Sequence, residues 1–123
     1  LTRTAVEDVR RLYTSDPDRF QTLFDDIAAI VEMGRVAIST GDHDVLGKLM
    51  FQNHAILQQL TVSSPLLDSL VEAAHAAGAI GAKLSGGGRG GNMIALTEPH
   101  NAEHVEKALL SAGAKRVFLT GVQ

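Results

Sequence analysis

Several residue types that build common functional sites are missing or scarce in this chain of 123 residues. It has no cysteine, which excludes disulfides and thiolate metal sites and suits a reducing compartment. Aromatic residues make up only 4% of the chain, and the formal net charge is −3. A nucleic-acid partner would need stacking platforms and a basic surface, so these values argue against one.

Long hydrophobic runs are also missing. No run approaches the roughly 18 residues of a membrane helix, and no basic start followed by an apolar core marks a signal peptide. The overall hydrophobic content of 45% nevertheless suffices for the core of one compact domain. We therefore expect a soluble, cytoplasmic, single-domain chain with no membrane partner. Residues 1–4 lack an initiator Met and run straight into helical spacing, which indicates a fragment of a longer protein.

Amphipathic periodicity fills the first two thirds of the chain. Apolar residues recur at spacings of three and four over residues 17–41, 42–60 and 65–78, which predicts three helices after a short first one. Residue types that cap helix N-termini stand before these three segments: Asp16, Asp42 or Asp44, and Ser64. Gly41 and Gly78 stand where two of the helices should end.

The period changes after residue 78. Residues 82–85 and 93–97 are short apolar runs of strand length, residues 99–113 predict a helix, and residues 116–120 predict a last strand. Helices followed by a small sheet favour an α+β fold over alternating α/β. Because three strands make a thin sheet with an exposed edge, we expect a further strand from upstream of residue 1 or from a partner.

Half of the twelve glycines lie in residues 81–91, between the two predicted strands. Such a cluster indicates a main chain that turns through positive φ or approaches another body closely, and its N–H groups suit a phosphate. A purely structural tight turn is the alternative. Gly86, Gly88 and Gly91 fit G-x-G-x-x-G, but a dinucleotide site needs a helix directly after the loop, and a strand is predicted there.

The histidines give weaker signals. His100 and His104 fit the zinc-binding pattern H-x-x-E-H, yet Glu106 is the only acidic side chain after them, so a solvated helix start explains them better and we assign no metal site. His54 follows Asn53 on the stripe of the second long helix. A hydrogen-bonded, half-buried histidine is favoured there over a catalytic one.

The segment from residue 81 to residue 96 resembles the third conserved motif of the GHMP small-molecule kinases, most closely that of the mevalonate kinases. Residues 41–54 and 62–68 are similar to the helical stretch before this motif, and Thr2-Arg3 to the segment that begins the family's C-terminal half. Gly87 departs from the pattern, because Ala commonly follows the second motif glycine.

The resemblance implies that residues 1–123 form a ferredoxin-like α+β domain, the C-terminal domain of a GHMP kinase, with amphipathic helices on a small antiparallel sheet. The family's N-terminal ATP-binding domain, which carries the catalytic residues, has no counterpart in the chain. The implied reaction is transfer of the ATP γ-phosphoryl group to the mevalonate 5-hydroxyl in isoprenoid biosynthesis, with ATP and Mg²⁺ held mainly by the N-terminal domain. The fragment alone should be inactive.

The same resemblance implies site residues and partners. The loop residues nearest the phosphates would be Ser85, Gly86, Gly87, Gly88, Arg89 and Gly90. Thr2 and Arg3 match positions close to the phosphoryl acceptor. The implied partners are the substrate, the chain's own N-terminal domain and a second copy in a homodimer. Two alternatives stay open: a non-catalytic small-molecule-binding or regulatory module, and a GHMP kinase for another substrate such as phosphomevalonate.

Overall fold

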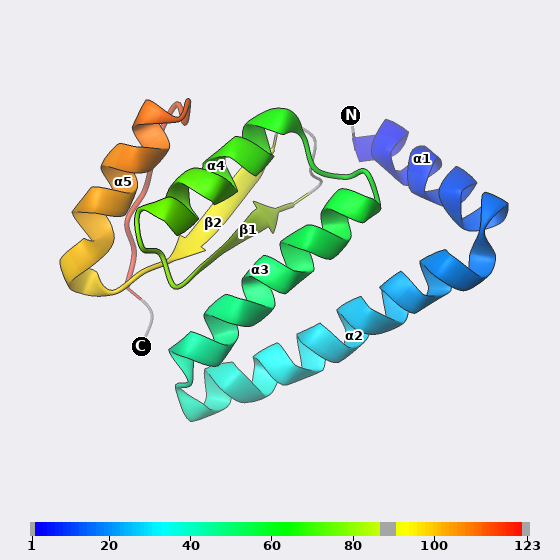
Figure 1. Ribbon diagram of the computed structural model, residues 1–123, viewed down its shortest axis with the longest axis horizontal. Coiled ribbons are helices and arrows are strands. Elements are labelled where there is room, and N and C mark those ends of the chain that lie inside the picture. Colours follow the sequence, from blue (N-terminus) through cyan, green and yellow to red (C-terminus); the bar gives the residue numbers. More distant parts are fainter. Residues whose placement is uncertain (1, 87–90, 122–123) are drawn as a thin grey trace.

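The computed structural model describes residues 2–86 and 91–121 (Figure 1). Over this part the chain forms, in order, α1 (Thr2–Ser15), α2 (Pro17–Thr40), α3 (His43–Gln59), α4 (Pro65–Ala76), β1 (Gly81–Ser85), β2 (Asn92–Leu96), the short 3-10 helix η1 (Pro99–Asn101) and α5 (Ala102–Ser111). The α+β class predicted from the sequence is confirmed.

Local capping chemistry sets where the long helices begin and end. The side chains of Asp16, Asp42 and Ser64 each accept a hydrogen bond from the amide three residues later, which satisfies a donor that the first helical turn leaves free. Asp42, and not Asp44, is thus the cap of α3. Gly41 ends α2 with φ of 71°, a left-handed conformation that glycine adopts without strain.

β1 and β2 pair as an antiparallel hairpin, in a register that runs from Gly81 opposite Leu96 to Ser85 opposite Asn92. Figure 1 shows α4 lying over this hairpin with α5 beside it, while α2 and α3 form a long antiparallel pair whose second helix runs along β1. One core cluster joins α4, α5 and the hairpin through small and branched side chains: Leu70, Val71, Ala74, Ala77, Ala79, Ala82, Val105 and Leu109. A second cluster joins α2 to the end of α3 around Phe20, Leu23 and Leu60.

The contact between α3 and β1 is made by backbone against backbone. A Cβ added at Gly81 would lie 2.5 Å from the Cα of Gly47, and a Cβ added at Gly47 would overlap the carbonyl oxygen of Ile80. Real side chains essentially never approach so closely. Helix and strand therefore reach this separation only because glycine stands on both sides.

The predicted strand over residues 116–120 is wrong. This segment runs without strand pairing, and Phe118 is 83% exposed. Its apolar residues suit a strand, but a strand needs a neighbouring ladder, and within the described residues β1 and β2 pair only with each other. The expectation that a further strand completes the sheet stays a prediction.

A smaller difference concerns the start of the last helix. The helix that was expected to begin at Pro99 starts as the 3-10 turn η1 and becomes α-helical at Ala102. Over the residues that the structure describes, no helix combines the length and the apolar character that crossing a membrane requires.

The glycine contact predicts opposite effects for two helical glycines. Gly47→Ala should destabilise the full-length protein by about 2 kcal/mol or more, because overpacking against a backbone carbonyl forces α3 off β1. Gly34→Ala is the matched control, since its Cβ would meet only a side-chain carbon of Leu46 at 4.0 Å. Helix propensity should then stabilise that variant by roughly 0.5–1 kcal/mol. The free energies of unfolding of both variants, measured by urea denaturation, test this prediction. Equal values for the two variants would show that Gly47 is not needed for the close approach of α3 to β1.

Candidate functional site

The glycine-rich connection between β1 and β2 begins at Ser85 and Gly86. Ser85 is half-buried and pairs with Asn92 at the end of the hairpin. Gly86 is exposed and has φ of 80°, so the chain leaves the strand through a left-handed conformation that a residue with a Cβ adopts only at a cost. The predicted loop residues Gly87, Gly88, Arg89 and Gly90 lie outside the described residues.

A groove of about 480 Å³ runs from this hairpin end between α2, α3 and β1. Most of its lining is aliphatic, supplied by Ile27, Ile30, Val31, Leu46, Leu49, Met50, Leu57, Val62 and Leu84. The polar groups lie along β1 and α3, where Lys83, Ser85 and Asn53 line the groove together with Gly86. Two of the predicted site residues therefore share one concave surface.

Lys83 and Asn53 are residues of this surface to which the sequence reasoning gave no role. Burial lowers the pKa of Lys83, because the surrounding apolar groups disfavour its charged form. Asn53 is 6% exposed, and its Oδ1 atom has no hydrogen-bond partner among the described residues. The available signal for Lys83 was a charged residue inside a short apolar strand.

His54 on α3 is hydrogen-bonded to both β1 and α4. Its ring is 3% exposed; the backbone N–H of Leu84 on β1 donates to its Nδ1 atom at 3.1 Å, and its Nε2 atom lies 2.9 Å from Oδ1 of Asp68 on α4. The hydroxyl of Ser63 donates to the same carboxylate oxygen at 2.6 Å. The sequence-based expectation of a hydrogen-bonded histidine is confirmed, although the ring is fully buried and not half-buried.

This Ser-His-Asp group is not a nucleophile system. In hydrolases the serine hydroxyl is bound to the histidine, which removes its proton. Here the hydroxyl of Ser63 donates to Asp68, and the other ring nitrogen of His54 is occupied by a backbone amide. The arrangement positions backbone and does not activate a hydroxyl.

Opposing effects act on the carboxylate of Asp68. Burial, the largest effect, acts to raise its pKa, but hydrogen bonds from Ser63, Gln58 and His54 together outweigh burial. The pKa of Asp68 therefore lies below its ordinary value of 3.8. The folded protein therefore favours the ionised carboxylate of Asp68.

Of the two predicted acceptor residues, Arg3 does not line the groove. Thr2 and Arg3 are the first residues of α1, which packs against α2. The side chain of Arg3 is 91% exposed and pairs with Glu7 along the same helix at 3.5 Å. The side chain of Thr2 lies outside the described part of the chain.

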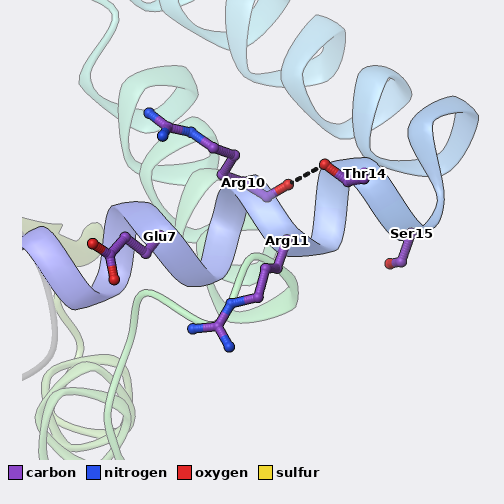
Figure 2. A pocket seen from close by; sticks show the side chains of 5 residues that line it. All are labelled: Glu7, Arg10, Arg11, Thr14 and Ser15. Carbon is purple, nitrogen blue, oxygen red and sulfur yellow. Dashed lines mark hydrogen bonds between the residues drawn. The ribbon is translucent and has the colours of Figure 1, made fainter.

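A second hollow on α1 is formed by Glu7, Arg10, Arg11, Thr14 and Ser15 (Figure 2). Figure 2 shows the side chains of Arg10 and Arg11 pointing to opposite sides of the helix, and the hydroxyl of Thr14 donating to the backbone carbonyl of Arg10 at 3.0 Å. All five residues belong to one helix and converge on no common point. We therefore take the hairpin groove, and not this surface, as the candidate site.

Comparison with known proteins gives consistent matches. The sequence family described as GHMP kinases C terminal matches residues 27–116. The mevalonate kinases of Thermococcus onnurineus and Pyrococcus abyssi are each 40% identical over 117 residues, which cover 91% of this chain and 35% of theirs. A galactokinase of Streptomyces coelicolor is 38% identical over 85 residues, which cover 68% of this chain and 22% of its own.

Solved structures agree with these sequence matches. The crystal structure of L. major mevalonate kinase in complex with R-mevalonate has a TM-score of 0.86 and 38% identity, over 90% of this chain and 34% of that one. Methanococcus jannaschii mevalonate kinase has a TM-score of 0.74 and 28% identity, over 90% and 32%. The chain thus spans about a third of the length of the mevalonate kinases it matches.

The lowered pKa of Asp68 predicts an acid-sensitive stability. A carboxyl group whose pKa is depressed by folding stabilises the protein above its unfolded pKa, and this contribution is lost as the pH falls through the folded pKa. The wild-type protein should therefore lose stability below about pH 4. Asp68→Asn should be less stable at neutral pH but show a shallower acid decline.

Urea unfolding midpoints between acid and neutral pH test this expectation in the full-length protein. Asp26→Asn is the matched control, because Asp26 is an exposed aspartate on α2. An Asp68→Asn curve parallel to the curves of the wild type and this control would contradict the role given to Asp68.

Proposed function

Because the chain belongs to the GHMP kinases, as a C-terminal domain of that family, we propose that the protein carrying it is a mevalonate kinase. The reaction transfers the γ-phosphoryl group of ATP to the 5-hydroxyl of mevalonate. The observation that carries this assignment is the 40% identity to mevalonate kinases over 117 residues. The family match also argues against the alternative of a non-catalytic regulatory module.

Phosphoryl transfer needs little covalent chemistry from the protein and much positioning and electrostatic stabilisation. We assign this role in the present domain to the segment Ser85, Gly86, Gly87, Gly88, Arg89 and Gly90. Glycine amides would face the phosphate oxygens, and Arg89 would add positive charge where negative charge develops. Thr2 and Arg3 are assigned to the neighbourhood of the acceptor.

The remaining parts of the active site belong to an N-terminal domain. Within the described residues, no three His, Asp or Glu side chains lie close enough to hold a metal ion. On the family resemblance we assign Mg²⁺ to the ATP phosphates and to residues of that domain, which would also hold most of ATP and the catalytic groups. We further propose a cytoplasmic enzyme that pairs as a homodimer.

A second candidate is a GHMP kinase for a different small alcohol. The match to a galactokinase over 85 residues supports it, since this domain alone resembles kinases of unlike substrates. Fold and family do not fix the acceptor, because substrate choice depends on contacts in the complete site.

An assay of the full-length protein separates the candidates. ATP consumption with Mg²⁺ should depend on mevalonate, with much lower kcat/KM for phosphomevalonate and galactose. A preference for either of the other two acceptors would replace the mevalonate assignment, and no consumption with any of them would refute it.

The isolated chain of residues 1–123 should not catalyse the reaction. The catalytic groups and most of the ATP site are assigned to another domain, so mixing the chain with ATP, Mg²⁺ and mevalonate should give no turnover above background. Turnover comparable with that of the full-length enzyme would show that the chain carries its own catalytic residues.

Gly86→Ala should lower kcat/KM of the full-length kinase. The added Cβ meets no atom of the described residues within 4 Å, so its expected effect is the strain of a positive φ, about 1–2 kcal/mol, which favours another loop conformation. Gly41→Ala is the matched control, since Gly41 also has a positive φ and free space but ends α2. Both variants should lose similar stability, and only Gly86→Ala should lose activity; equal activities would contradict the assigned role of the loop.

A further inference from the structure

We propose that His54 is a positioning residue of this kinase, which holds the amide of Leu84 and thereby sets where the glycine loop begins. The proposal deepens the proposed function, since it concerns the same loop. His54 lines no part of the groove beside the loop, and it acts through the backbone that leads into the loop.

The hydrogen bonds assign the protonation of the ring. A backbone N–H can only donate, so the Nδ1 atom that receives the Leu84 N–H carries no proton. The proton must then lie on Nε2, which donates to Oδ1 of Asp68. His54 is thus the neutral Nε2–H tautomer, and a proton added at Nδ1 would set two donors against each other.

Both ends of the ring are fixed, so its orientation is fixed too. Asp68 lies in the first turn of α4, and its carboxylate also accepts from Ser63, just before that helix. Asp68 on α4 therefore orients the ring from one side. In other proteins, a carboxylate or carbonyl bound to one ring nitrogen orients a metal-binding or catalytic histidine in the same way. Nδ1, the other ring nitrogen, then faces the edge of β1, where it accepts the N–H of Leu84.

The hydrogen bond to Leu84 fixes a backbone group close to the start of the loop, which apolar packing alone would not do. Leu84 is buried on β1, and its N–H goes to His54 instead of to β2, so the ring satisfies a donor that would otherwise be orphaned. Two residues later the chain turns through the positive φ of Gly86. A shift of the Leu84 amide is therefore passed directly to Ser85 and Gly86.

Two conservative variants of the full-length kinase separate the two ring contacts. Asn places its side-chain oxygen near the position of Nδ1 and can still accept from Leu84, whereas Gln reaches the position of Nε2 and can still donate to Asp68. We expect His54→Asn to keep kcat within about threefold of wild type. His54→Gln should lose of the order of ten- to a hundredfold in kcat, because small displacements of a positioning element carry such costs.

Hydrogen exchange of the Leu84 amide gives an independent measurement of the same contact. Exchange should stay slow in wild type and His54→Asn and become at least tenfold faster in His54→Gln. His104→Gln is the matched control, because His104 is exposed on α5, and it should change neither readout. Equal kcat and equal Leu84 exchange in the two His54 variants would overturn the proposal.

A wild-type experiment covers the case in which the variants do not fold. Long-range ¹H–¹⁵N spectra of the full-length protein at neutral pH should show His54 with a protonated Nε2 and an unprotonated Nδ1. The opposite tautomer or an imidazolium ion would overturn the proposal. The exchange and tautomer readouts need no substrate, so they remain decisive even if the enzyme proves to phosphorylate an acceptor other than mevalonate.

Discussion

The close approach of α3 to β1 is the constraint on which the rest of the site depends. Gly47 and Gly81 let the two backbones touch, and a side chain at either position would push helix and strand apart. Seven residues further along α3, two helical turns, His54 reaches the amide of Leu84, three residues along β1 from Gly81. The distance from Gly47 to His54 along α3 and the distance from Gly81 to Leu84 along β1 are both about 10 Å. The glycine contact and the histidine hydrogen bond can therefore form together, and they fix the position of the strand along the helix.

This attachment explains how a two-stranded hairpin can hold residues 85 and 86 in a fixed position. An isolated hairpin is marginally stable, because half of its backbone groups and both of its faces lack partners. Here α4 and α5 cover one face through small residues such as Ala74 and Ala82, and α3 holds the other side of β1. The connection that begins at Gly86 thus starts from a strand that is fixed at both Gly81 and Leu84.

Buried polar groups give this assembly its specificity. Asp68, Ser63 and His54 form hydrogen bonds that connect the start of α4 to the end of β1, and each bond has a buried or half-buried partner. Such bonds add little net stability, but leaving one partner unpaired is expensive. Alternative placements of β1 against α3 would orphan the Leu84 amide and the ring, so the network favours one arrangement over near neighbours.

Signals that act over a few residues could be found in the sequence alone. Periodicity and caps placed the long helices, with Asp16, Ser64 and Gly41 at the predicted positions, because capping involves only nearby backbone groups. The glycine cluster between two apolar runs likewise located the hairpin and its loop. The strand expected at residues 116–120 failed, since local pattern does not supply the ladder that a strand requires. The Gly47–Gly81 contact, the place of Lys83 in the groove and the two bonds of His54 join residues from 14 to more than 30 positions apart, so only the tertiary structure decided them.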